Sequence, residues 1–233
     1  MLWFQDGRMW TEGASMATTQ HVEPKLPYEG KFWMLVAPPV RHYIKKLYGS
    51  ELARKAYKGG KPLYRELIDR APAIGAGNPM ATNLYLACVV FAMWKACDGE
   101  LTPDMVREVL RALFASRVVR SAAEKGDLRK PENMAKLNES LHACAAWAEE
   151  RPAIKDATWQ FHFDDDRGGT IAHYHYTRCP INDLARQEGL MEILPVMCET
   201  DYLNLENKHA RFTREHTLAE DGPYCDFLIE PGE

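Results

Sequence analysis

Apolar residues recur at three- and four-residue spacing through the first two thirds of the chain, which predicts helices. A helix is expected over 40–58, with a break at Gly49-Ser50, and the run 59–62 (GGKP) predicts that it stops there. The stretch 82–97 is apolar on most sides and predicts a buried helix. Further helices are expected over 63–70, 103–117 and 132–149.

After residue 152 the period of the pattern changes to two. Residues 158–163 and 170–177 alternate around a turn at 164–169, which predicts a β-hairpin. Short helices over 181–187 and 191–206 follow, and then strands over 210–218 and 224–229. The sequence therefore predicts an α+β fold, with an N-terminal helical half and a C-terminal ββ-αα-ββ antiparallel sheet packed with helices.

The same patterns predict the organisation of the chain. Residues 1–35 are expected to be an N-terminal extension, 36–152 a helical region, and 153–233 an α+β region that carries the cysteine and acid motifs. The predicted regions form one compact unit, because no flexible linker separates them.

Composition narrows the function classes. The formal charge of −4 and the lack of a Lys/Arg run argue against nucleic acid as a partner. No apolar run reaches the roughly 18–20 residues of a membrane helix, so no membrane partner is expected. Six cysteines without an export signal predict reduced thiols in a cytoplasmic protein. The oligomeric state stays open, with a homo-oligomer as one alternative.

Three cysteines of the last quarter stand at the ends of predicted elements. Cys179 lies between a strand and a helix, Cys198 shares a helix face with Asp201, and Cys225 lies early in the last strand. Strand ends and an adjacent helix can converge, so one small polar pocket is geometrically possible. The alternative is that these thiols are small apolar core residues, as free cysteines often are. The remaining cysteines, on apolar helical stripes, are predicted to be core: Cys88, Cys97 and Cys144.

Carboxylates accompany these thiols. Glu199 and Asp201 lie in a mostly apolar helix, where a half-buried acid needs a partner or a shifted pKa; the alternative is that both face water. Asp226 and Cys225 point to opposite faces of a strand, so only one of them can face the core.

The histidines allow two interpretations. His173 and His175 share a strand face, and His162 on the facing strand could join them as metal ligands. The alternative is a solvent-facing row beside the acids at 164–166. Neither CxxC nor HExxH is present, so no metal ligand is assigned and no cofactor is expected. Zinc held by three thiolates and a carboxylate or histidine is the minority alternative.

The motifs RCP at 178–180, PVMCETDY at 195–202 and GPYCDF at 222–227 resemble the L-2-amino-thiazoline-4-carboxylic acid hydrolase family. The loop PAIGAGN at 72–78 is also similar to that family, and the resemblance covers roughly residues 40–230. It implies an enzyme, a hydrolase that opens a small five-membered heterocycle such as a 2-aminothiazoline, a cyclic amidine or a hydantoin-like ring. The partner would be a small-molecule substrate, and water would add at the carbon between the heteroatoms.

Candidate residues follow from this chemistry. The thiol and acid groups expected to catalyse are Cys225, Asp226, Glu199, Asp201 and Cys198, with Cys225 as the first choice of covalent nucleophile. Those expected to bind substrate are Cys179, Arg178, Asn78 and His175. One alternative is a non-catalytic small-molecule-binding or zinc-binding module that resembles vinyl-reductase-type domains, and another is an interaction protein whose cysteines are all core.

Overall fold

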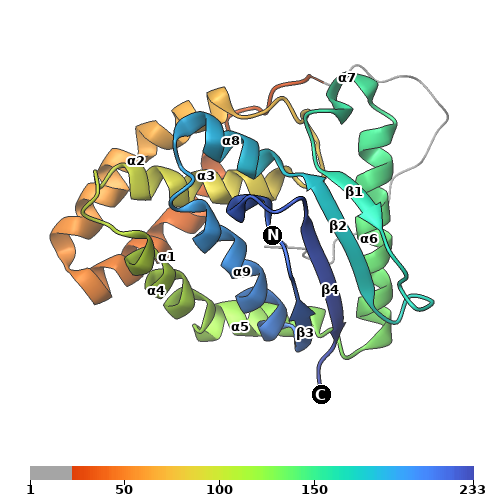
Figure 1. Cartoon of the computed structure of the whole chain (residues 1–233). Helices are drawn as coiled ribbons and strands as arrows, with labels where there is room; N and C mark the ends of the chain where they lie inside the picture. The colour runs from red at the N-terminus through yellow and green to blue at the C-terminus, as the bar shows by residue number, and fades with distance from the viewer. Residues whose placement is uncertain (1–22) are drawn as a thin grey trace.

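A computed structural model describes residues 23–233 (Figure 1). Helices come first in the chain and a four-stranded antiparallel sheet follows, which confirms the α+β prediction. The helices are α1 (Gly30–Tyr48), α2 (Ser50–Arg70), α3 (Ala81–Lys95), α4 (Pro103–Phe114), α5 (Arg117–Ala123), α6 (Pro131–Glu149), α7 (Pro152–Lys155), α8 (Pro180–Glu188) and α9 (Leu194–Asn207). The strands are β1 (Gln160–Phe163), β2 (Ala172–Arg178), β3 (Ala210–Thr213) and β4 (Cys225–Pro231).

The sheet has the order β1-β2-β4-β3, so the strand that comes last in the chain lies inside the sheet. Burial alternates along β2 and β4, as the period-two pattern predicted. The inward face carries Tyr174 and Tyr176, which pair in register with Phe227 and Cys225. Helix α9 lies between this sheet and α4, and α6 runs along β1 and β2 (Figure 1).

The helical half is built around α3, in which twelve of fifteen residues are buried. Helix α2 packs on α3 and continues through residues 59–62, so the predicted stop there is wrong. Packing explains the difference: a Cβ on Gly60 would lie 2.8 Å from Cη2 of Trp33 and 3.2 Å from the carbonyl oxygen of Ala92. The glycine is present because three helices approach closely at this point.

The N-terminal boundary also differs from the prediction. Helix α1 begins at Gly30 and buries Trp33, so residues 30–35 belong to the packed fold and not to an extension. The first 22 residues of that predicted extension lie outside the described residues.

The strand predicted over 210–218 ends at Thr213. The carboxylate of Asp226 accepts the N–H groups of Glu215 and His216 at 2.8 and 2.7 Å, and these bonds turn the chain away from the sheet. A short 3₁₀ turn, Leu218–Glu220, then leads back to β4. We call residues 215–224 the connecting segment. Within residues 23–233, no helix has the length and hydropathy that crossing a membrane requires.

Candidate active site

A narrow cavity lies where the start of α8, the middle of α9 and the start of β4 meet. Three cysteines line it together, Cys179, Cys198 and Cys225, although 19 and 27 residues separate neighbours in the chain. Its volume is about 30 Å³, which is room for one or two water molecules. The sequence motifs around these thiols therefore converge on one small cavity.

Asp201 and Arg214 add charge to this space. Nη2 of Arg214 donates to Oδ2 of Asp201 at 2.8 Å, and both side chains are almost fully buried. Desolvation raises the pKa of Asp201, whereas the charge and hydrogen bond of Arg214 lower it. A buried carboxylate paired with a guanidinium stays ionised, so the cavity holds a fixed negative group beside its thiols.

Backbone carbonyls and aromatic rings also contact the guanidinium of Arg214. Its Nε donates to the carbonyl of Asp226 at 3.1 Å and its Nη1 to the carbonyl of Cys198 at 3.3 Å. The guanidinium also lies over the rings of Phe227 and Phe212, 4.2 and 4.7 Å from their centroids. These contacts fix the cation and leave little freedom to rotate.

Burial keeps the three thiols protonated. It raises the pKa of Cys179 to about 12 and raises those of Cys198 and Cys225 as well. The charge of Arg214 opposes this for Cys198 and Cys225. Sγ of Cys225 also accepts the N–H of Leu218 at 3.2 Å. Cys225 therefore has a nearby cation and a hydrogen-bond donor, both of which stabilise a thiolate.

Cys179 lies at the N-terminus of α8. The amide groups of Ile181 and Asn182 lower its pKa, but burial outweighs them. Asn182, on the same turn, also lines the cavity.

Asp226 lies on the opposite sheet face from Cys225, where it accepts the two N–H groups of the connecting segment described above. The structure does not bring its carboxylate into the cavity with the thiols, because neighbouring residues of a strand point to opposite faces. Its position suits it to shape the segment that covers Cys225.

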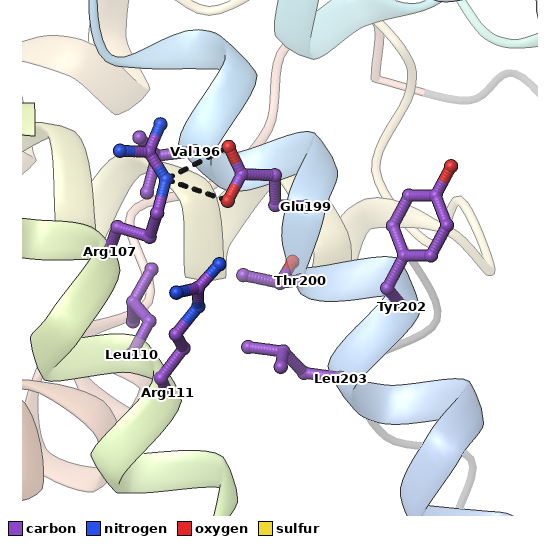
Figure 2. A pocket seen from close by; sticks show the side chains of 8 residues that line it. All are labelled: Arg107, Leu110, Arg111, Val196, Glu199, Thr200, Tyr202 and Leu203. Atoms are coloured by element: carbon purple, nitrogen blue, oxygen red, sulfur yellow. Dashed lines mark hydrogen bonds and ion pairs between the residues drawn. The ribbon is translucent and has the colours of Figure 1, made fainter. Parts of the chain in front are cut away.

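Glu199 points away from the cavity, toward α4. Nε of Arg107 donates to both carboxylate oxygens at 3.0 and 2.8 Å, across a groove of about 240 Å³ (Figure 2). Arg111 and Leu203 line the same groove. Glu199 and Asp201 are two residues apart on α9, so they point to different sides of the helix, and only Asp201 shares a face with Cys198.

The other predicted substrate-binding residues lie elsewhere. Asn78 is buried and bonds to Ile74 and Thr158, which orders the loop before α3. Arg178 pairs with Asp183 at 2.8 Å. His175 lies on the half-exposed sheet face, with Nδ1 3.0 Å from Asp164 and its ring stacked on His162. These three side chains serve local structure outside the cavity.

Sequence reasoning missed Arg214 and Asn182, as well as Trp159 and Tyr176, which also line the cavity. The sequence held a signal for Arg214. It lies two residues after Phe212 in the predicted strand, so the two side chains should point to the same face of the sheet. A cation on the face that packs on the core needs a carboxylate partner. No comparable signal marked Asn182. Throughout residues 23–233, no set of three or more Cys, His, Asp or Glu side chains has an arrangement that could hold a metal ion.

Comparison with known proteins gives one match. The model of the L-2-amino-thiazoline-4-carboxylic acid hydrolase family matches residues 82–229, a span that includes all three cavity cysteines together with Asp201 and Arg214. No curated protein and no solved structure gives a significant match. The matched span exceeds half of the chain and coincides with the part that forms the cavity, and the chain therefore belongs to the L-2-amino-thiazoline-4-carboxylic acid hydrolase family.

Proposed function

We propose that this protein is a hydrolase that opens a 2-aminothiazoline or a related cyclic amidine by adding water at the carbon between the heteroatoms. The observation that carries the proposal is the convergence of three thiols and the buried Asp201–Arg214 pair in one cavity. The family name points to the same chemistry. A carboxylate suits a protonated amidine, and a thiol suits attack on its electrophilic carbon.

Cys225 is the proposed nucleophile. As its Sγ attacks the ring carbon, Asp201 takes the thiol proton, since a thiol with a raised pKa needs a base. The bond between the ring carbon and the ring sulfur breaks, and the released sulfur takes the proton from Asp201. The former ring carbon is now bound to Sγ of Cys225 as an isothiourea.

Water completes the reaction. It adds to the same carbon, the bond to Sγ breaks, and the Cys225 thiol regains a proton. The product is an N-carbamoyl amino thiol, which is the substrate plus one water. The alternative, in which Asp201 activates water for direct attack, gives the same product without a covalent intermediate.

Arg214 supports either route without reacting. It holds the carboxylate of Asp201 in place, and its charge favours the ionised forms of Cys198 and Cys225. A fixed cation that stabilises a developing thiolate needs no reorganisation during the reaction.

Substrate entry requires an opening. The cavity has room for water, and a five-membered ring with a carboxylate is several times larger. Leu218 and Ala219 of the connecting segment form part of its wall. This segment is tied by Asp226 and by the ion pair of Asp221 with Arg186 at 2.7 Å. We therefore include movement of the connecting segment in the proposed cycle.

Mass spectrometry tests the function. The purified protein is incubated with a panel of 2-aminothiazolines, cyclic amidines and hydantoin-like rings, and the products are examined for the gain of one water. Turnover should fall at least about 100-fold in Cys225→Ser and Asp201→Asn. The matched control is Cys97→Ser, since Cys97 is also buried but lies just after α3, outside the cavity.

Three results would decide against parts of this proposal. Full activity in a folded Cys225→Ser protein would remove its covalent role. Equal losses in Cys225→Ser and Cys97→Ser would indicate a general effect on folding. No turnover of any ring, with an intact small molecule retained in the native mass, would favour the second candidate, a non-catalytic binding module. The small volume of the cavity and its protonated thiols are the observations that support this second candidate.

A further inference from the structure

Asn182, one of the residues that line the cavity, has a buried polar atom that forms no hydrogen bond within residues 23–233. Asn182 is only 9% exposed, and in the part of the chain that the structure describes its Oδ1 has no hydrogen-bond partner. The backbone amide of the same residue, in the first turn of α8, has a partner, because it forms a hydrogen bond with Cys179. A buried carbonyl oxygen that forms no bond destabilises a fold, so its presence needs an explanation.

The surroundings of Asn182 suggest what this oxygen is for. It lines the same cavity as the three thiols, Asp201 and Arg214. Apart from Asp201, whose Oδ2 is occupied by Arg214, the remaining wall is mostly apolar, with Ile181, Leu194 and Phe227 among its members. A ligand that enters when the connecting segment moves, with an N–H group directed at Oδ1, would satisfy this acceptor.

We propose that Asn182 is the specificity-determining residue of the cavity, where its Oδ1 accepts an N–H of a ring that bears an amino group on the carbon to be attacked. The inference rests on the proposed function and names the feature of the substrate that the site selects. A ring with a methyl group in that position has the same size but no donor, so it would leave Oδ1 buried and unsatisfied. A site that forms a hydrogen bond with its substrate discriminates against an analogue without that donor more strongly than a site that distinguishes ligands by size alone.

The test compares two probes, 2-aminothiazoline-4-carboxylate and 2-methylthiazoline-4-carboxylate. Equilibrium binding is measured in a Cys225→Ser background so that turnover does not consume them. The otherwise unchanged chain should prefer the amino ring at least about tenfold. Asn182→Leu, of similar size, should lose that preference, and Asn182→Asp, which keeps an acceptor oxygen, should retain it.

A second readout does not depend on any ligand. Without ligand, Asn182→Leu should raise the melting temperature by about 2 °C or more, because it removes a buried group without a bond. Asn78→Leu is the matched control. Asn78 is also buried, but its side chain bonds to Ile74, Thr158 and the amide of Met80, so its replacement should lower the melting temperature.

These results separate the two proposals. If the protein turns over aminothiazolines but Asn182→Leu keeps the preference for the amino ring, the role of Asn182 is overturned and the hydrolase proposal stands. If the preference depends on Asn182 but no ring is opened, the hydrolase proposal fails and Asn182 is the recognition residue of a binding module. Binding of neither ring, or a lower melting temperature for Asn182→Leu, would also overturn the role of Asn182.

Discussion

Asp201 on α9 and Arg214, the residue after β3, form an ion pair of 2.8 Å in which neither side chain is more than 5% exposed. The pair joins a helix to the end of a strand thirteen residues later. Two charges removed from water stabilise a fold only if each keeps its partner.

Asp201→Asn should therefore be strongly destabilising. Removal of the carboxylate charge leaves the buried Arg214 guanidinium without a counter-charge, and the free energy of unfolding should fall by about 3–5 kcal/mol. Urea denaturation measures the loss. Glu199→Gln on the same helix is the control: its pair with Arg107 is about one third exposed, and the cost should be about 0–1 kcal/mol. Similar losses in both variants would contradict this account.

Alkaline pH should weaken the fold. Burial raises the pKa of Cys179 to about 12 and those of Cys97 and Cys144 to about 11, above the ordinary value of 9.0. Below pH 9 these thiols are protonated in both the folded and the unfolded chain. Above pH 9 the unfolded chain loses these protons first, so stability should fall as the pH rises toward 11–12.

Urea midpoints between pH 7 and pH 10.5 test this direction. The decline should be shallower in Cys97→Ser, which removes one of the groups. Alkylation followed by peptide mapping gives a second test, since iodoacetamide reacts with thiolates. Labelling of Cys179 in the folded protein should keep rising with pH toward 12, whereas its thiol is half ionised at pH 9 in the unfolded chain, where labelling levels off earlier. A midpoint that rises with pH would contradict the expected burial.

Asp226→Asn should loosen the connecting segment. The substitution removes a charged acceptor from the amides of Glu215 and His216, at a cost of about 1.5–3 kcal/mol. Hydrogen exchange of these two amides should accelerate, and Cys225 should be alkylated faster. Asp164→Asn is the control on the same sheet face, because Asp164 contacts His175 and does not bind this segment. Unchanged exchange at residues 215 and 216 would argue against the role of Asp226.

Gly60→Ala should destabilise the protein although alanine favours helices. The added Cβ would meet the Trp33 ring at 2.8 Å and the backbone of Ala92 and Met93 at 3.2 Å. Such overpacking costs about 1–3 kcal/mol, which should exceed the helix gain of about 1 kcal/mol. Gly30→Ala is the control, since its nearest neighbour lies at 3.5 Å. Thermal unfolding distinguishes them, and a more stable Gly60→Ala would show that α1 and α3 can move apart.

The sheet was predictable because apolar and polar residues alternate along its strands. In any strand, successive side chains point to opposite faces of the sheet, so this pattern does not depend on which strand lies beside it. The break between α1 and α2 was predictable from Gly49, which has a φ of 97°. Gly59-Gly60 carries the same residue type but neither bends the chain nor ends α2. Sequence alone does not distinguish a glycine that bends the chain from one that allows a neighbouring helix to pack closely.

The candidate site was predictable to the extent that it rests on local spacing. Cys198 and Asp201 share a cavity because they are three residues apart on a helix, and Cys225 was bound to oppose Asp226 on its strand. Arg214 was missed because the strand was predicted to continue to residue 218, which made the arginine one of several alternating polar residues. Its importance depends on where β3 ends, and that is fixed by the side chain of Asp226, a tertiary contact.

The position of β4 also has a consequence for biosynthesis. The β1-β2 hairpin can pair as soon as it leaves the ribosome, but within residues 23–233 the strand that pairs with β3 is β4, which is translated later. Until β4 inserts between β2 and β3, Cys225 is absent from the cavity and Arg214 lacks the backbone carbonyl that receives its Nε. The nascent chain therefore exposes an incomplete sheet, and Cys179 and Cys198 lack the shielding of β4 until that strand has been translated and inserted.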